Sequence, residues 1–449
     1  MDTSESRIIV VGAGLAGLSA AWQLRATAGG VTLLERGHAP GGRARGAVSE
    51  GFVLEPLSPV VSSEDRELLR FVADVGVQDQ LLPPRPVTTA QVRSGAPRVF
   101  DPRGLLELAR LPGVRPWEGL RLIRLPRLMR RYGARIDPEA PERAADLDDR
   151  SVSDFARLYF GRSVLDRGLG PFLTSASLAD ENEASRVLLL QRQHRHFGAR
   201  RVVPRAAWAE LAEAAAAGVS TLYEAEVTKL EPARDGRWLV SYVREGRERL
   251  VEAEAVVLAV PPADAARLGE GNLTTGEREV LEGIRHVAAL TLCVATCRPL
   301  APRPLEIRVP HAEGLPLETA LIEPGLSGGR VPDGYGLVAL HATGSWSDRA
   351  LRLPDETVEK ELLDALARIQ PGARAAVDFT RIFRTPAARP RFDVGHYRKL
   401  ARFARIEDDC LAEGRTLVTA GDWRMDPSWN GAVASGARVA RALRAALDR

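Results

Sequence analysis

The sequence predicts an α/β fold in which a Rossmann-like domain carries a second, α+β domain inserted into it in two segments. Three observations support this prediction: a strand, glycine turn and helix pattern at the N-terminus, a similar pattern at the C-terminus, and a buried strand pattern between them. With 449 residues, the chain is long enough for two or three domain-sized units. Because the three segments would build one parallel sheet, we expect the chain between them to form the second domain.

The first element is the segment of residues 7–36, which reads as an apolar strand, a glycine turn, a helix and a second strand. Gly12 permits the tight turn, Gly14 leaves space where a pyrophosphate must approach, and Gly17 allows the helix to pack closely on the strand. The helix N-terminus then faces the phosphates. Glu35 ends the second strand, where a carboxylate reaches ribose hydroxyls and disfavours a 2′-phosphate. We therefore predict a dinucleotide site that includes Gly12, Gly14, Leu15, Ala16, Gly17, Glu35 and Arg36.

A second glycine element follows the second strand directly. Gly41 and Gly42 supply two flexible backbone positions, and Arg43 supplies a guanidinium that can fork onto phosphate oxygens. This element resembles the GGR motif of the FAD enzymes in the superfamily of amine oxidases, phytoene desaturases and protoporphyrinogen oxidases. The resemblance implies FAD rather than NAD as the cofactor, and a Rossmann-like FAD-binding domain of the glutathione reductase-like type.

The C-terminal element occupies residues 416–447, where a strand again meets a glycine turn and a helix. The resemblance implies that Asp422, which follows Gly421, lies by the ribityl chain and pyrophosphate. It also implies that the flavin pyrimidine ring meets the backbone of Gly431, Ala432 and Val433. Reduced flavin gains negative charge near N1, and a helix N-terminus stabilises an anion by roughly 0.3–1 kcal/mol. We therefore expect this helix to tune the flavin potential by roughly tens of millivolts.

The middle element combines a strand over 222–230, a hairpin around 235–242 and a buried strand that begins at Ala255. The superfamily has the same order of elements. By resemblance, Val227 contacts the adenine and the strand from Ala255 returns to the dinucleotide-binding sheet.

These elements define the predicted domains. The FAD-binding domain takes residues 1–60, 203–265 and 396–449, and the substrate-binding domain takes 61–202 and 266–395. Apolar positions three and four apart predict that the first insertion is mostly helical. The helices expected in the two insertions cover residues 65–75, 103–111, 117–132, 152–161 and 355–369.

Residues 51–56, 151–162 and 394–400 resemble the protoporphyrinogen oxidase-like branch, whereas the Gly421-Asp-Trp ending resembles desaturases and hydroxysqualene-processing enzymes. The chain also departs from these patterns. Leu57 stands where the branch usually has a glycine close to the flavin, and residues 204–207 replace a glycine pair that is typical of the family. Residues 288–296 contain no lysine. In many amine oxidases a lysine on this strand holds a water beside flavin N5, so its absence counts against a standard amine oxidase.

Composition excludes several other classes of protein. The net charge of +3 gives no support for nucleic-acid binding. Three cysteines, Cys293, Cys297 and Cys410, form neither a disulfide framework nor a metal-ligand spacing, so we expect no metal and a reducing compartment. There is no signal-peptide pattern and no membrane-spanning run, which predicts a cytoplasmic protein. Residues 120–132 are basic and amphipathic, a pattern that fits a solvated helix face or peripheral contact with an anionic membrane.

The predicted activity is transfer of a hydride from a largely apolar small molecule to flavin N5, with oxygen or another acceptor taking the electrons, as in protoporphyrinogen oxidases or polyene desaturases. Three alternatives stay open: amine or amino acid oxidation, redox-neutral isomerisation or cyclisation, and a non-catalytic FAD-binding scaffold. No catalytic residue can be identified, because the flavin itself is the electron sink. Side chains with two possible roles are His194 and His196 (acid or base, or surface), Trp423 and Trp429 (pocket walls or packing), and Cys293 and Cys297, expected on one side of a strand.

Overall fold

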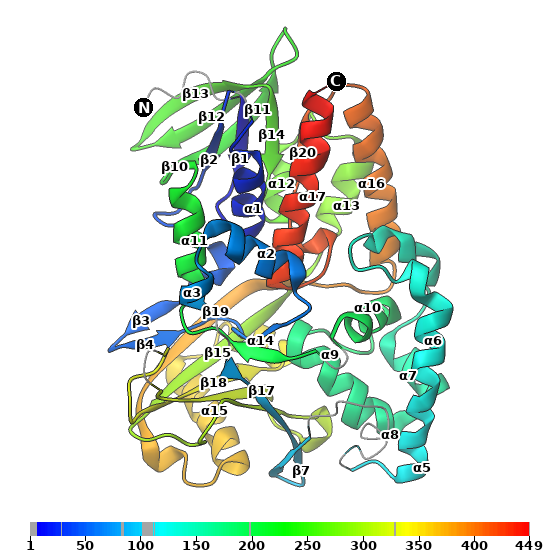
Figure 1. Cartoon of the computed structure of the whole chain (residues 1–449), viewed down its shortest axis with the longest axis vertical. Helices are drawn as coiled ribbons and strands as arrows, with labels where there is room; N and C mark the ends of the chain where they lie inside the picture. Colours follow the sequence, from blue (N-terminus) through cyan, green and yellow to red (C-terminus); the bar gives the residue numbers. More distant parts are fainter. Residues whose placement is uncertain are drawn as a thin grey trace.

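The computed structural model describes residues 7–27, 29–81, 85–100, 111, 113–196, 199–326 and 329–448. The elements form an upper and a lower part, and both termini lie at the upper end of the molecule (Figure 1). The upper part contains the parallel sheet and the helices from the two ends of the chain. The lower part contains the largest sheet and helices α5 (Pro116–Gly119), α7 (Val152–Tyr159), α8 (Arg162–Val164) and α9 (Gly170–Ser177) of the first insertion (Figure 1). In contrast, α2 (Arg66–Val75) of that insertion lies beside α17 (Trp429–Leu447) (Figure 1).

The sheet of the upper part has five parallel strands from three separate segments of the chain. Its central strands are buried along their whole length, as expected for a parallel sheet covered on both faces. The strand order is β10 (Ser220–Leu222), β2 (Val31–Leu34), β1 (Ile8–Val11), β14 (Ala255–Leu258) and β20 (Leu417–Thr419). This arrangement is the mixed α/β architecture that the sequence predicted.

Two helices from opposite ends of the sequence pack side by side on this sheet, α1 (Leu15–Leu24) and α17 (Trp429–Leu447). A Cβ added to Gly436 would lie 2.1 Å from the carbonyl oxygen of Ala16, so only glycine permits this close approach. The two ends of the chain therefore hold each other at the edge where strands β1 and β14 end.

The middle segment differs from the prediction in one respect. The strand expected over 222–230 is split, because β10 ends at Leu222 and β11 begins at Glu226. Glu224, in the turn between them, has a positive φ of 54°, which ends one strand and redirects the chain. A separate antiparallel sheet follows, made of β11 (Glu226–Pro232), β12 (Trp238–Arg244) and β13 (Arg247–Ala253).

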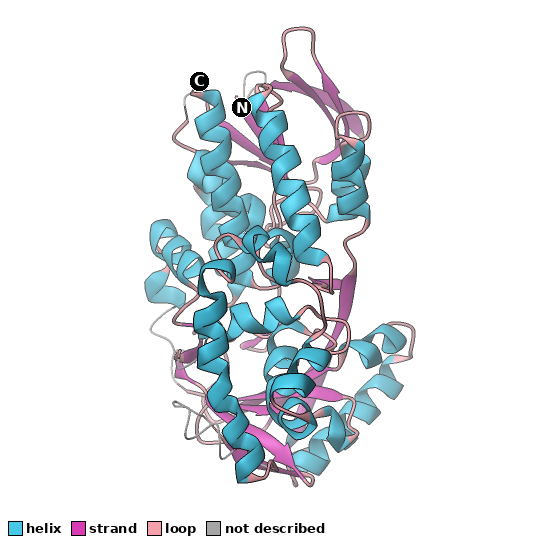
Figure 2. Cartoon of the chain, turned by 90° about the vertical axis from the view of Figure 1, so that its right-hand side faces the viewer, coloured by secondary structure: helices cyan, strands magenta, loops and turns pink. Residues whose placement is uncertain are grey.

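The lower part is built on a seven-stranded mixed sheet whose strands come from both insertions. Strand β7 of the first insertion pairs in parallel with β16 of the second, which joins the two insertions into one sheet. The strand order is β19 (Val377–Pro390), β15 (His286–Thr296), β18 (Gly336–Ala342), β17 (Leu317–Pro324), β16 (Leu305–Arg308), β7 (Thr88–Arg93) and β8 (Ala96–Val99). Seen from the side, helices lie in front of these strands (Figure 2).

The predicted helices over 65–75, 152–161 and 355–369 are confirmed as α2 (Arg66–Val75), α7 (Val152–Tyr159) and α15 (Asp355–Ile369). The helix over 117–132 is divided into α5 (Pro116–Gly119), a 3-10 turn at 120–123 and α6 (Arg124–Tyr132). Pro126 has no N–H to donate to the carbonyl of Leu122, so it is tolerated only in the first turn of α6. The helix expected over 103–111 falls almost entirely on residues outside the described part of the chain.

No helix in the described ranges is long and apolar enough to cross a membrane. The boundaries proposed between the two domains remain a prediction. The remaining helices and strands are β3 (Ala47–Ser49), β4 (Phe52–Leu54), β5 (Val61–Ser62), α3 (Gln78–Leu81), β6 (Arg85–Pro86), α8 (Arg162–Val164), α9 (Gly170–Ser177), α10 (Arg186–His196), β9 (Arg201–Val203), α11 (Trp208–Ala217), α12 (Pro262–Leu268), α13 (Thr275–Glu282), α14 (Gly344–Ala350) and α16 (His396–Ala412).

Candidate functional site

A cavity of about 370 Å³ opens at the carboxyl ends of the parallel strands, where open α/β sheets bind their ligands. Its walls come from all three segments of the upper part. Most of the residues predicted from the sequence to bind the cofactor line it: Gly12, Gly14, Leu15, Ala16, Glu35, Arg36, Gly41, Gly42, Arg43, Val227, Gly421, Asp422 and Ala432.

Gly17, Gly431 and Val433 do not line the cavity, and the structure shows what each does instead. A Cβ on Gly17 would lie 1.9 Å from the carbonyl oxygen of Gly12, so this glycine permits the helix to sit against the turn. A Cβ on Gly431 would lie 2.0 Å from the carbonyl oxygen of Asp426, which closes the loop before α17. Val433 is buried in the core, and its carbonyl accepts the Ser19 hydroxyl at 2.8 Å.

The turn between β1 and α1 leaves room for a phosphate. A Cβ added to Gly14 would meet no atom within 4 Å, so the backbone there is open to the cavity. Within the described residues no side chain caps α1, and its first turn holds no acidic residue. The N-terminal N–H groups of a helix attract anions, so this turn fits the pyrophosphate of a dinucleotide.

Glu35 lies at the end of β2, and its carboxylate binds backbone N–H groups on both sides. Its carboxylate accepts the N–H of Ala13 at 2.7 Å and the N–H of Gly37 at 2.7 Å. These bonds tie the end of β2 to the glycine turn. The glycine pair that follows is held to the same turn, because Gly41 donates its N–H to the carbonyl of Ala13 at 2.8 Å.

Arg43 joins the N-terminal segment to the C-terminal one. Its guanidinium donates to the Asp422 carboxylate at 2.8 Å and to the carbonyl of Ala388 at 2.9 Å. Arg43 also lines the cavity, and its predicted contact with phosphate oxygens stays a prediction. The Asp422 side chain is 4% exposed, so the pair brings a largely buried carboxylate to the cavity wall.

The start of α17 forms the opposite wall. Ser428 caps this helix, since its hydroxyl accepts the N–H of Gly431 at 3.0 Å. Both Trp423 and Trp429 line the cavity, which resolves their role in favour of pocket walls. The Trp429 indole N–H is buried and has no hydrogen-bond partner in the described part of the chain. An unpartnered buried donor at a cavity wall fits a bound group that supplies an acceptor.

A buried cation also lies at this wall. The Arg389 guanidinium carbon is 4.5 Å from the centroid of the Trp429 ring, and burial lowers the pKa of Arg389 to about 10. Burial also lowers the pKa of His286, which lines the cavity. Sequence reasoning missed both side chains, because neither belongs to a local motif. Only the folding of β15 and β19 against the C-terminal segment brings them to the cavity.

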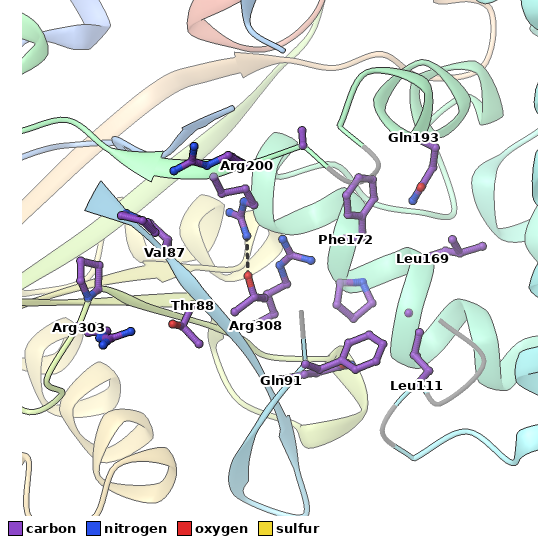
Figure 3. Close-up of a pocket in the computed structure, with 18 of the residues that line it drawn as sticks. Val87, Thr88, Gln91, Leu111, Leu169, Phe172, Gln193, Arg200, Arg303 and Arg308 are labelled. Carbon is purple, nitrogen blue, oxygen red and sulfur yellow. Dashed lines mark hydrogen bonds between the residues drawn. The ribbon is translucent and has the colours of Figure 1, made fainter. Parts of the chain in front are cut away.

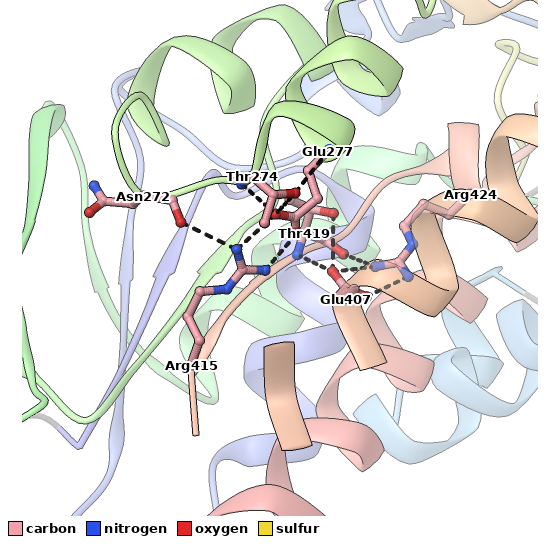
Figure 4. A network of polar contacts seen from close by, with 7 residues as sticks. All are labelled: Asn272, Thr274, Glu277, Glu407, Arg415, Thr419 and Arg424. Carbon is pink, nitrogen blue, oxygen red and sulfur yellow. Dashed lines mark hydrogen bonds and ion pairs between the residues drawn. The ribbon is translucent and has the colours of Figure 1, made fainter. Parts of the chain in front are cut away.

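A polar network supports the chain that leads into the cavity from β20 (Figure 4). Glu407 of α16 accepts two bonds from Arg424, at 2.6 and 3.0 Å, and one from the backbone N–H of Thr419 at 3.1 Å. Arg415 pairs with Glu277 of α13 at 2.5 Å. Burial alone would raise the pKa of Glu277, but Arg415 outweighs it and lowers that pKa. These paired charges fix both ends of β20, and with them the position of Gly421 and Asp422.

A second and larger cavity, of about 970 Å³, lies in the lower part of the molecule (Figure 3). One end is apolar, and Leu111, Leu169 and Phe172 point into it (Figure 3). Arg200 and Arg303 lie toward the other end (Figure 3). Among the described residues, the lining contains no acidic side chain and five arginines: Arg85, Arg200, Arg201, Arg303 and Arg308.

One buried carboxylate lies behind this lining. Glu306 pairs with Arg201 and with Arg308, the latter at 2.9 Å. Burial would raise the pKa of Glu306, but the two arginines outweigh it and hold that pKa at about 2. Even with this carboxylate ionised, the described wall of the cavity keeps a large positive charge. The cavity therefore presents an apolar space with a cationic end.

Helix α10 contacts both the lower cavity and the loop before α17. Gln193 of this helix lines the lower cavity, and Arg195, two residues on, pairs with Asp426 just before α17. Of the two histidines on this helix considered as acid or base, His194 is exposed, and the side chain of His196 lies outside the described residues. Cys293 is buried and Cys297 is exposed just after the end of β15. The expectation that the two cysteines share one side of a strand is therefore wrong.

Comparisons with known proteins identify the family of the chain. The family model described as flavin containing amine oxidoreductase matches residues 15–444. Over 183 residues the chain is 27% identical to protoporphyrinogen oxidase 2, chloroplastic/mitochondrial, of Arabidopsis thaliana, covering 40% of this chain and 34% of that protein. The chain thus aligns with about a third of the length of the curated relatives it matches.

Solved structures agree on the fold. A protein provisionally named protoporphyrinogen oxidase from Exiguobacterium sp. 255-15 superposes with a TM-score of 0.75 at 16% identity, over 100% of both chains. A triple mutant of putrescine oxidase superposes with a TM-score of 0.77 at 18% identity, over 98% of this chain and 99% of that one. At these identities the likeness concerns the fold alone.

Proposed function

This chain belongs to the flavin containing amine oxidoreductase family, and we propose that it oxidises a largely apolar small molecule that carries an anionic group. It is an FAD-dependent oxidoreductase. The observation that carries the proposal on the substrate is the composition of the lower cavity. A space lined by apolar side chains at one end and by five arginines across the remainder suits an amphiphilic anion.

FAD, when bound, supplies the electron sink for removal of a hydride from the substrate. The residues proposed to hold it are those of the upper cavity. The open backbone at Gly14 and the N-terminus of α1 suit the pyrophosphate, and the unpartnered Trp429 indole N–H suits an acceptor on the cofactor. Arg389 places a buried positive charge against Trp429, which lines this cavity, and such a charge stabilises negative charge that develops on a neighbouring group.

The work of the protein on the substrate is then to bind, orient and exclude water. Leu169 and Phe172 provide apolar contact, and Arg200 and Arg303 provide donors for the anionic group. Fixing one end of the substrate by charge and the other by shape limits how the substrate can lie in the lower cavity. We assign no catalytic acid or base. Among the described residues, no titratable side chain lines both the upper and the lower cavity.

The charge of the lower cavity argues against the amine-oxidising alternative. An ammonium group in a cavity that five arginines line would meet like charge, which disfavours its binding. Strand β15 also contains no lysine. Protoporphyrinogen-like molecules, with an apolar ring system and carboxylate arms, match the cavity better than amines do.

The test is anaerobic bleaching of the purified, FAD-loaded protein. Protoporphyrinogen IX, its dimethyl ester and a hydrophobic amine of similar size should be compared as reductants, because only the first carries the anionic groups. We expect the free acid to bleach the flavin absorbance at least tenfold faster than the ester, with no bleaching by the amine. Bleaching by the amine alone would contradict the proposal, and a product of unchanged mass would identify a redox-neutral reaction instead.

A further inference from the structure

A third cavity, of about 200 Å³, contains a buried carboxylate that the proposed oxidation does not use. Glu318 of β17 lines this cavity and is 2% exposed. Its Oε1 atom is buried and has no hydrogen-bond partner in the described part of the chain. Thr174 of α9 bonds to the carboxyl group. A deeply buried acid that lines the cavity therefore has one oxygen whose bonding capacity is unused.

Two other buried glutamates of this protein have arginine partners. Glu55 pairs with Arg330, and Glu407 pairs with Arg424. Glu318 has no such ion pair in the described residues, and burial raises its pKa to about 7. A buried acid without a cation costs free energy whenever it ionises. A cation from solution would form with Glu318 the ion pair that arginine forms with Glu55 and Glu407.

The surroundings of Glu318 are also negative. The cavity lining contains Asp180, Glu183, Asp348 and Asp393 in addition to Glu318, against Arg391 and His311. Asp180, Glu183 and Asp348 are exposed, so they form a charged rim around an entrance that leads to the buried acid. Clefts lined by one sign of charge concentrate counter-ions of the opposite sign.

The cations near this cavity already have carboxylate partners. Arg391 pairs with Glu183 and with Asp393, the latter at 3.3 Å, and Asp393 also pairs with Arg285 at 2.7 Å. His311 lies 3.5 Å from Glu181, whose hydrogen bond raises the His311 pKa. No partner remains on the described walls for the free oxygen of Glu318.

The rest of the lining selects the kind of cation. Leu178, Leu188, Val287 and Phe392 give the cavity apolar walls beside the acid. A bare metal ion would need several ligands, and among the described residues no group of three or more His, Cys, Asp or Glu side chains is arranged to hold one. An ammonium head with a short alkyl chain would satisfy both the acid and the apolar walls.

We propose that the cavity at Glu318 binds a small organic ammonium ion, with the ammonium group on the free Glu318 oxygen and its alkyl part against the apolar walls. The site is separate from the cofactor cavity. His286 lines the cofactor cavity and Val287 lines this one, and successive residues of a strand point to opposite faces. The bound ammonium is thus a ligand of the substrate domain, and this proposal does not depend on the identity of the oxidised substrate.

The experiment is titration calorimetry of the FAD-loaded full chain with n-propylammonium chloride. We expect affinity to rise about tenfold between pH 6 and pH 8, because a group with a pKa near 7 is about one tenth ionised at the first value and about nine tenths ionised at the second. At pH 7, titrations in two buffers of different ionisation enthalpy should show proton release on binding. Glu318→Gln should abolish both the binding and the proton release.

Other titratable groups face this cavity, so controls must separate them. They are Asp180, Glu181 and Glu183 of the loop after α9, His311, Asp348 of α14, and Arg391 and Asp393 after β19. His311 also loses charge as pH rises, so His311→Gln should keep the pH dependence if Glu318 is the group that titrates. Glu356→Gln removes the same charge from an exposed position of α15 outside the cavity and should leave the binding unchanged.

Two results would overturn the proposal. One is equal binding by wild-type protein and Glu318→Gln, provided that the variant keeps its FAD and its cooperative melting transition. The other is the absence of any propylammonium binding at pH 8 up to millimolar concentration, which would leave Glu318 as a buried acid that takes only a proton. Potassium chloride serves as the inorganic control. Equal affinity for potassium and propylammonium would show that the apolar walls do not contribute to binding.

Discussion

Arg43 and Asp422 lie 379 positions apart in the sequence, and their side chains meet at 2.8 Å across the cofactor cavity. One belongs to the glycine element after β2 and the other to the turn after β20. The pair therefore joins the first and last segments of the chain at the cavity wall. The Asp422 carboxylate is largely buried, whereas the Arg43 guanidinium is partly exposed. The carboxylate therefore depends more on the ion pair than the guanidinium does, because water can still solvate the guanidinium.

Loss of Arg43 should weaken FAD retention. Arg43→Ala leaves the Asp422 carboxylate without its cation, and we expect destabilisation of about 1–3 kcal/mol, the usual cost of a buried polar group left unsatisfied. The measurements are the melting temperature and the FAD content after gel filtration. Arg45→Ala, two residues away and exposed, is the matched control. Equal loss of FAD in both variants would show that the pair has no special role.

Substitution of Gly14 should affect FAD binding, whereas substitution of Gly17 should affect the stability of the fold. An added Cβ on Gly14 meets open space in the cavity, so Gly14→Ala should keep the melting temperature of the FAD-free protein and lower FAD affinity by roughly tenfold or more. An added Cβ on Gly17 would lie 1.9 Å from the Gly12 carbonyl oxygen, so Gly17→Ala should lower the melting temperature itself. FAD titration followed by absorbance, together with thermal melts, distinguishes the two effects. A Gly14→Ala protein with normal FAD affinity would place the pyrophosphate elsewhere.

The cationic end of the lower cavity should determine substrate preference. Arg303→Ala removes a charge-assisted hydrogen bond worth roughly 1.5–3 kcal/mol, so kcat/KM for an anionic substrate should fall at least tenfold. The uncharged ester should be oxidised at an unchanged rate. Arg298→Ala, exposed and outside the lining, is the control. An equal loss for acid and ester would mean that Arg303 acts on structure rather than on charge recognition.

The surface around α5 and α7 should bind anionic membranes. Four large apolar side chains are exposed there, Trp117 (63%), Leu120 (48%), Ile123 (55%) and Leu158 (64%), and Arg121, Arg124 and Arg127 surround them. We propose that this face contacts a lipid surface, through which an apolar substrate could enter. Co-sedimentation with phosphatidylglycerol vesicles should exceed that with phosphatidylcholine and should fall as salt is added. Trp117→Ser with Ile123→Ser should reduce it, and unchanged sedimentation of this variant would refute the proposal.

Glu318 should make stability depend on pH. Its pKa rises from 4.5 to about 7 on folding, so between these values the folded chain holds a proton that the unfolded chain has released. The free energy of unfolding therefore falls as pH rises through this window, by up to roughly 3 kcal/mol. Glu318→Gln should be as stable as wild type at pH 4.5 and more stable at pH 8, as measured by denaturant unfolding. A variant that is less stable than wild type at pH 8 would contradict this sign.

The sequence alone predicted most of the residues that line the upper cavity, because they belong to short local motifs. The glycines at 12, 14 and 41 act through backbone conformation and the space left by a missing side chain, both of which depend on adjacent residues. Buried strands β1, β2 and β14 were recognisable for the same reason, as continuous apolar runs. Helix α15 followed from its apolar period and was confirmed at both ends.

Only the tertiary structure decided the lower part and the polar contacts. The pairing of β7 with β16 joins residues more than two hundred positions apart. Arg201 of β9 likewise meets Glu306 of β16 only in the folded chain. The same holds for Arg389 against Trp429 and for the protein bonds of Arg43 and Glu35, which no local motif specified. The physical reason is that a long polar side chain adapts to whichever partner folding places within reach. A glycine turn is specified by its own backbone, whereas an ion pair or a cavity exists only after distant segments have packed.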